Sequence, residues 1–181
     1  KNLINSECKN VDVIDTAQTV SSSGRIIHIS PVAQGDGHNN RDGLSIFTKG
    51  VFVRGMVEHN QLNTTTCMRV FVVRDNMNQG TAPVLSDILE TTAVSTAPLS
   101  PMRDETKSRF SILYSKILTM STNGNNSQLF KFYVPLKKHI KYTGSASTDE
   151  WKNQLYLVAV SNTATNDPLI SFHSRLTFYD N

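Results

Sequence analysis

The chain has 181 residues, of which 38% are hydrophobic and 18% charged, and its 18 basic and 15 acidic side chains give a formal net charge of +3. This length suits one domain over residues 1–181, and the abundance of Ser, Thr and Asn favours β-structure with polar loops over a helix bundle. We expect no membrane span, because no apolar run approaches about 20 residues, and no signal peptide, because the first ten residues have no apolar core.

The first third of the chain predicts strands separated by polar loops. Residues 11–20 (VDVIDTAQTV) alternate imperfectly and predict a strand, and residues 25–30 (RIIHIS) predict a second, shorter one. Residues 34–43 (QGDGHNNRDG) are rich in glycine, acids and amides and predict a loop.

Residues 44–59 predict a long strand, with bends or bulges at Gly50 and Gly55. Its candidate inward positions are Ile46, Val51, Val53 and Val57. The connection after residue 59 is short, so we expect an antiparallel hairpin with the next strand.

The stretch 67–80 (CMRVFVVRDNMNQG) begins as a strand that is largely apolar on both faces. Such a strand is central in its sheet and covered on both sides. It stops at a cluster of turn-forming residues, 75–80.

The second half of the chain continues in the same manner. Residues 83–89 predict its one short helix, with Pro83 at the start. Ile117 and Leu118 fit a strand and could equally sit in a helix. The remaining predicted strands are 109–121, 129–135, 155–161 and 170–179. About eight strands joined by long loops predict an all-β fold, an eight-stranded antiparallel jelly-roll sandwich with one short helix rather than an up-and-down barrel.

The residues offer little catalytic chemistry. The sequence has no nucleophile elbow, no paired metal-binding histidines on a helix and no phosphate-binding loop. Cys8 and Cys67 lack a metal-ligand spacing, and we interpret them as free buried thiols, with a disulfide as the alternative. We therefore expect no enzyme and no required cofactor.

Two groups of basic residues are candidates to face a nucleic acid. Lys137, Lys138 and Lys141 form the densest cluster, and Arg25, Lys49 and Arg54 join them if their strands face one surface. A solvated face explains each group separately. Aromatic residues do not interleave with the lysines as they do in single-strand stacking platforms, so we expect no such platform.

The loop at residues 34–43 loosely imitates a calcium-binding EF-hand loop, with Asp36, His38, Asn40 and Asp42 alternating. The histidine and the missing twelfth-position glutamate break that pattern, and the flanks are strands, so a solvated loop explains it better. On these grounds the chain is a non-catalytic β-sandwich that binds sugars or a receptor, forms a trimeric ligand, or tiles a shell.

Residues 71–89 (FVVRDNMNQGTAPVLSDIL) resemble the coat proteins of satellite tobacco necrosis virus and its relatives. The resemblance continues upstream through residues 34–36 (QGD) and 52–55 (FVRG), and downstream through residues 107–113 (KSRFSIL). It covers roughly residues 25–120 and fades toward the C-terminus.

The resemblance implies a jelly-roll capsid subunit that self-assembles in the host cell into a T=1-type icosahedral virion around single-stranded DNA or RNA. It permits a host receptor or glycan as a further partner and implies no membrane. The alternative from the residues alone is a carbohydrate- or receptor-binding module. The family usually carries a basic N-terminal arm, whereas the first twenty residues hold only Lys1 and Lys9. We expect the arm to have been removed, to lie outside this sequence, or to be replaced by the inner face of the sandwich.

The resemblance also implies structural calcium at subunit contacts. The matching positions are the carboxylate of Asp180 and the backbone carbonyls near Asp42 and Ser45. The residue types at 42, 44 and 45 differ from those of the family. Backbone carbonyls at these positions could therefore still bind calcium, whereas the side chains could not. The same resemblance marks residues 74–78 (RDNMN) as a structural signature that fixes the exit of the strand toward the Pro83 helix.

Overall fold

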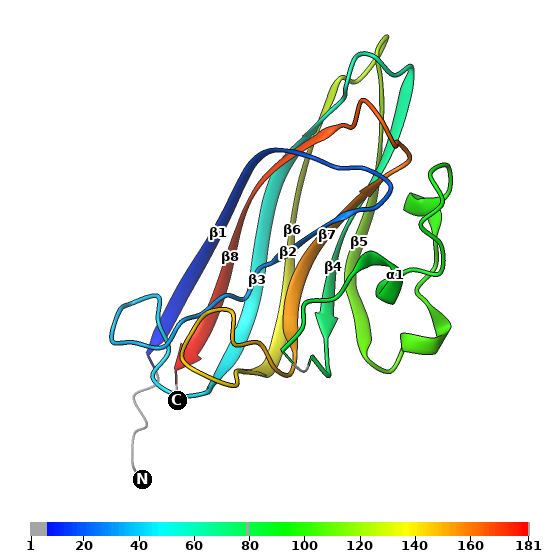
Figure 1. Cartoon of the computed structure of the whole chain (residues 1–181). Helices are drawn as coiled ribbons and strands as arrows, with labels where there is room; N and C mark the ends of the chain where they lie inside the picture. The colour runs from blue at the N-terminus through cyan, green and yellow to red at the C-terminus, as the bar shows by residue number, and fades with distance from the viewer. Residues whose placement is uncertain (1–6, 79, 181) are drawn as a thin grey trace.

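The computed structural model describes residues 7–78 and 80–180. Two antiparallel four-stranded sheets pack face to face, and short helices lie beside one of them (Figure 1). The strands are β1 (Cys8–Thr19), β2 (Arg25–His28), β3 (Ser45–Glu58), β4 (Thr65–Asp75), β5 (Phe110–Ser121), β6 (Ser127–Lys141), β7 (Gln154–Ser161) and β8 (Leu169–Asp180). The helices are α1 (Leu85–Ile88) and the 3-10 turns η1 (Ala97–Leu99) and η2 (Asp104–Thr106). Lys1 and any N-terminal arm lie outside the described residues.

The strand order is β1-β8-β3-β6 in the first sheet and β2-β7-β4-β5 in the second. Six of the seven sequential connections cross from one sheet to the other, and only β4 and β5 are sequential neighbours in one sheet. This order confirms the predicted all-β antiparallel jelly roll with one short α-helix. The expected hairpin between β3 and β4 is wrong, because each is an inner strand that needs partners on both sides, and they find them in different sheets.

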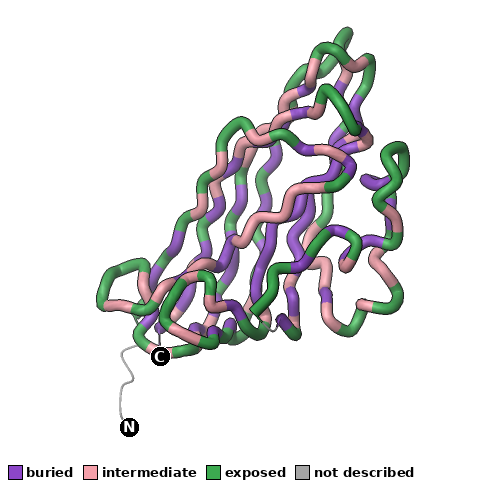
Figure 2. Tube along the Cα trace, in the orientation of Figure 1, coloured by how far each residue is buried: buried purple, intermediate pink, exposed green. Residues whose placement is uncertain are grey.

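The first core lies between the two sheets. All four predicted inward residues of β3 are fully buried there, and buried and exposed positions alternate along the strands (Figure 2). Gly50 lies at a shift in the β3–β6 register, as predicted, whereas Gly55 remains in register. At Gly55 the constraint is packing, because a Cβ atom would lie 2.5 Å from Cζ of Phe130.

The strand β6 is longer than expected and continues past Pro135 to Lys141. Proline has no N–H to donate, but β6 is an edge strand and Pro135 pairs with Gly50 beside the irregular register. The basic residues that follow Pro135 therefore lie on the same strand. Leu118 also lies on a strand, β5, where it is buried in the first core.

A second core covers the outer face of the second sheet. Phe71 and Val73 of β4 pack there with Leu85 and Ile88 of α1. The opposite face of β4 supplies Met68, Val70 and Val72 to the first core. The strand is therefore covered on both faces, as the sequence predicts.

Residues 74–78 fix the chain where it leaves β4. Asp75 is fully buried, its Oδ2 lies 2.7 Å from Nη2 of Arg109, and its Oδ1 accepts a hydrogen bond from the Met77 amide. Arg74 donates to Oδ1 of Asn76 at 2.7 Å. These contacts support the structural role expected for this segment.

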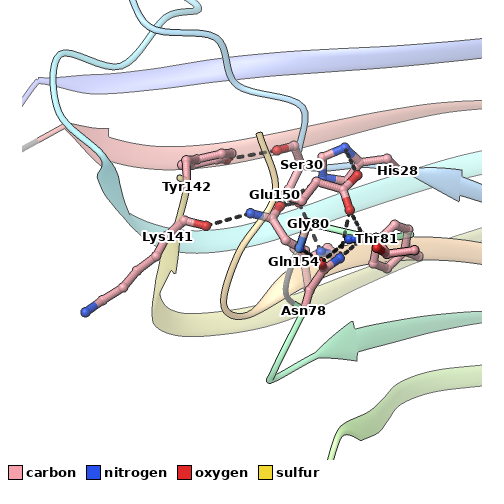
Figure 3. Close-up of polar contacts among 11 residues, drawn as sticks. His28, Ser30, Asn78, Gly80, Thr81, Lys141, Tyr142, Glu150 and Gln154 are labelled. Carbon is pink, nitrogen blue, oxygen red and sulfur yellow. Dashed lines mark hydrogen bonds and ion pairs between the residues drawn. The ribbon is translucent and has the colours of Figure 1, made fainter. Parts of the chain in front are cut away.

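Asn78 extends this anchoring into a buried polar network (Figure 3). Its amide nitrogen donates to Oε2 of Glu150 at 2.8 Å and to the Tyr156 hydroxyl at 2.6 Å, and its oxygen accepts from the amides of Gly80 and Thr81. Oε1 of Glu150 lies 3.1 Å from Nδ1 of His28. The network ties the loop after β4 to β2, to β7 and to the segment before β7.

Cys8 is exposed and Cys67 is half-buried, and neither forms a disulfide. The prediction of free thiols is confirmed, but their predicted burial is wrong because both lie at positions that the sheets leave partly open. Across the part of the chain that the structure describes, no helix is long and apolar enough to span a membrane.

We expect Asp75→Ala to lower the free energy of unfolding by about 3 kcal/mol, since it leaves Arg109 without its buried partner. The matched control is Asp104→Ala, which removes an exposed pair with Lys107 and is expected to cost at most about 0.5 kcal/mol. Urea denaturation of both variants measures the difference, and equal stabilities would contradict the anchoring role of Asp75.

Burial lowers the pKa of His28 below its ordinary value, although the carboxylate of Glu150 acts in the opposite direction. The unfolded chain, with a histidine pKa near about 6.5, therefore takes up a proton at higher pH than the folded chain does. Stability from this group is present above about pH 6.5 and is lost as the pH falls through the folded-state pKa. We expect His28→Gln to flatten the decline in unfolding free energy between about pH 7 and 5. Parallel profiles for the two proteins would show that His28 does not contribute.

Candidate nucleic-acid interface

The outer face of the β1-β8-β3-β6 sheet carries a row of basic side chains. Arg54 of β3 pairs across the strands with Lys131 of β6 on one side and His173 of β8 on the other. The Cβ atoms of such paired residues lie about 5 Å apart, so the positive charges of Arg54 and Lys131 repel one another. Arg54 and Lys131 are exposed, and neither forms a salt bridge with any residue of 7–78 or 80–180. Their charge is available to an anion from outside.

The adjacent row is aromatic. Phe52 of β3 pairs with Tyr133 of β6, and the two side chains are 39% and 53% exposed. On its other side Phe52 faces Arg175, which binds both carboxylate oxygens of Asp12 at 2.6 and 2.7 Å. This hydrogen bonding from Arg175 lowers the pKa of Asp12. The face is therefore neutralised near β1 and remains cationic near β3 and β6.

Two depressions follow these rows. A groove of about 760 Å³ is lined by Arg54, Met56, Leu129, Lys131 and His173, and also by Asp15 of β1 and by Lys116 of β5 in the other sheet. A smaller one of about 250 Å³ is lined by Phe52, Arg54, His173 and Arg175. Arg54 and His173 line both, so the grooved surface is continuous around them.

The structure brings most of the predicted basic residues to this sheet. Lys49, Lys137 and Lys138 are all exposed and lie at the shift in the β3–β6 register, where Lys137 adopts a φ of 51°. Lys141 ends β6, and its ammonium lies 5.7 Å from the ring of Trp151.

Arg25 does not share this surface. It lies on β2 in the other sheet, and its guanidinium is 2.8 Å from Oδ2 of Asp15. The condition placed on Arg25, that its strand face the same surface as Lys49 and Arg54, is not met.

This face also holds four residues that the sequence did not single out, Lys131, Phe52, Tyr133 and Arg175. The expectation that no aromatic residues interleave with the basic ones is wrong, because the interleaving occurs across strands rather than along the chain. A signal was present in β6, where Leu129, Lys131 and Tyr133 alternate with the buried Phe130, Phe132 and Val134.

The residues considered for calcium lie at one end of the same sheet. Oδ2 of Asp180 accepts hydrogen bonds from the Asp42 amide at 2.9 Å and from Nζ of Lys9 at 3.0 Å. The Ser45 hydroxyl lies 3.2 Å from Nδ1 of His139. Oδ1 of Asp180 is buried and has no hydrogen-bond partner among the described residues.

Within one chain these residues do not fit a calcium ion, because Lys9 already supplies the positive charge. Its ammonium lies within 4 Å of carboxylate oxygens of Glu7, Asp42 and Asp180, and its side chain is only 5% exposed. The hydrogen bond to Asp180 raises the pKa of Lys9. A divalent ion, which takes six to eight oxygen ligands, would be repelled by this ammonium. Over the described residues, no three acidic, histidine or cysteine side chains are grouped to hold a metal.

The chain is similar in sequence to known viral coat and capsid proteins. The family profile described as "Satellite tobacco necrosis virus coat protein" matches residues 1–180. The coat protein of Maize white line mosaic satellite virus is 24% identical over 182 residues, covering 96% of this chain and 81% of that protein. The capsid protein of Satellite tobacco necrosis virus 1 is 30% identical over 131 residues, covering 70% and 64% of the two chains. The capsid protein of Pepper huasteco yellow vein virus is 24% identical over 185 residues, covering 96% and 72%.

The family match extends over nearly the whole chain, well beyond the segment that carries the resemblance in the sequence, and the jelly-roll order agrees with it. The chain is a viral capsid protein and belongs to the satellite tobacco necrosis virus coat protein family.

Proposed function

We propose that this capsid protein assembles in the host cell into a T=1-type icosahedral shell that encloses a single-stranded genome, DNA or RNA. The outer face of the β1-β8-β3-β6 sheet is directed toward that genome. The observation that carries the proposal is the uncovered pair of cations, Arg54 and Lys131, at the middle of this face.

The two sheets differ in a way that supports this orientation. The second sheet carries α1 and its own buried core on its outer face, whereas the outer face of the first sheet presents exposed side chains from β3, β6 and β8. Cations that lack acidic partners gain most by binding phosphates, because binding releases the counter-ions condensed on the nucleic acid. This contact is independent of base sequence, which suits the packaging of a whole genome.

Self-assembly is tested by electron microscopy of the purified protein, which is expected to show uniform closed particles. A protein that stays monomeric at high concentration and physiological salt would contradict the shell. Glycan binding by such a monomer would instead support a carbohydrate- or receptor-binding sandwich.

We expect particles of the double variant Arg54→Gln, Lys131→Gln to retain less nucleic acid per subunit than wild-type particles. Removing two phosphate contacts lowers the salt slope of binding by about 1.4 units, since each contact with a single strand contributes about 0.7. The control, Lys107→Gln with Lys152→Gln, removes the same charge from exposed sites outside this sheet. Absorbance ratios of purified particles measure the content, and equal losses in the two double variants would contradict a specific interface.

Structural calcium at Asp180 and the carbonyls of Asp42 and Ser45 remains a prediction. The ammonium of Lys9 already balances the charge of Asp180, so the fold does not require the ion. We expect EDTA to change the unfolding free energy of the wild-type chain by less than about 1 kcal/mol, whereas saturating calcium at a hundred times its Kd contributes about 2.7 kcal/mol. Lys9→Met leaves Asp180 without its cation and is expected to cost about 3 kcal/mol.

Lys107→Met is the control for Lys9→Met, because Lys107 pairs with Asp104 at the surface. A wild-type chain that EDTA destabilises strongly would show that the ion binds despite Lys9. A Lys9→Met variant as stable as the control would show that Lys9 is not the counter-ion of Asp180.

A further inference from the structure

The ring of Tyr133 lies directly over the backbone of Gly50 on the neighbouring strand. A Cβ atom at position 50 would lie 2.2 Å from the Tyr133 oxygen, 2.5 Å from Cζ and 2.7 Å from Cε2, so only glycine leaves room for the ring. A glycine inside a strand commonly marks such a close approach. One side of the Tyr133 ring therefore rests against the backbone of β3.

The other side of this ring is open. Tyr133 is 53% exposed although it rests on the sheet, and it stacks on no aromatic ring among the described residues. It adds nothing to either buried core. The result is a flat aromatic surface whose orientation is set before any ligand arrives, which lowers the entropic cost of binding.

Basic residues neighbour Tyr133 along β6 and on the paired strand β3. Lys49 immediately precedes Gly50 and is exposed, and Lys137 is exposed in the same irregular part of the β3–β6 pairing. Lys131 lies two residues before Tyr133 in β6, on the same face of the strand, opposite Arg54. An aromatic surface flanked by cations is the arrangement that binds a base by stacking and its phosphates by charge.

We propose that Tyr133 is a stacking platform for an unpaired base of single-stranded nucleic acid, and that Lys49, Arg54 and Lys131 contact the flanking phosphates. The inference rests on the proposed function, in which nucleic acid lies on this face. It adds a preference for single strands, because the bases of a duplex are stacked on each other and offer no free face to Tyr133. The exposed ring of Phe52, the cross-strand neighbour of Tyr133, extends the same surface.

The test measures binding of short oligo(dT), oligo(U) and a duplex of the same length to the full chain, kept below its assembly concentration. Tyr133→Ala is expected to weaken binding of both single strands about tenfold to a hundredfold, the loss that follows when a base loses its aromatic partner. Tyr133→Phe, which keeps the ring, is expected to bind like the wild type. The duplex affinity is expected to be the same in all three proteins.

The matched control is Leu99→Ala, which truncates an exposed apolar side chain in η1, away from this sheet, and is expected to bind like the wild type. A Tyr133→Ala variant that binds single strands as well as this control would overturn the stacking platform and leave the charged interface standing. Equal losses for single strands and duplex would also overturn it. A wild-type chain that binds no nucleic acid would contradict the proposed interface itself.

Gly50→Ala supplies a second, independent variant. Its methyl group displaces the Tyr133 ring without removing it, so single-strand affinity is expected to fall as in Tyr133→Ala. Thermal unfolding of the same sample shows whether the variant is folded. A folded Gly50→Ala protein with wild-type affinity would contradict the claim that glycine orients the ring for binding.

Discussion

The strand β4 is apolar on both faces, and burying both faces makes the sandwich asymmetric. One face of β4 joins the core between the sheets, and the other requires a cover, which α1 and the segment around η1 provide. The turn that leads from β4 to this cover is held by Asp75 and Asn78, both fully buried. The second sheet is therefore enclosed on both sides, while the first has one buried face and one face in contact with solvent, an arrangement that antiparallel sheets permit.

This asymmetry leaves one broad sheet surface with which a capsid subunit can contact other molecules. The side chains on it come from strands that are far apart in the sequence, such as β3, β6 and β8. Their charge is balanced near Asp12 and unbalanced near Arg54 and Lys131. The same sheet ends at Lys9 and Asp180, where the chain neutralises its own carboxylates. The subunit thus presents unpaired positive charge at Arg54 and Lys131. At the end of the sheet, its positive and negative side chains neutralise one another.

Local patterns in the sequence predicted the eight strands, the short helix and the inward residues of β3, because alternation and turn residues act over a few positions. These patterns did not predict which strands pair with one another. Two inner strands, β3 and β4, look like a hairpin along the chain yet lie in different sheets. The pair of Lys9 and Asp180 joins residues 171 positions apart, and the contact of Tyr133 with Gly50 depends on the β3–β6 register. Most of the candidate interface depends on such pairing, so its aromatic half could not be predicted from spacing.

We propose above all that the β1-β8-β3-β6 sheet turns its outer face toward the packaged genome. A high-resolution electron cryo-microscopy structure of the assembled particle tests this most directly. We predict that this face lines the interior and that nucleic-acid density lies over Arg54, Lys131 and Tyr133. A particle in which this face points outward, or is buried between subunits, would contradict the account.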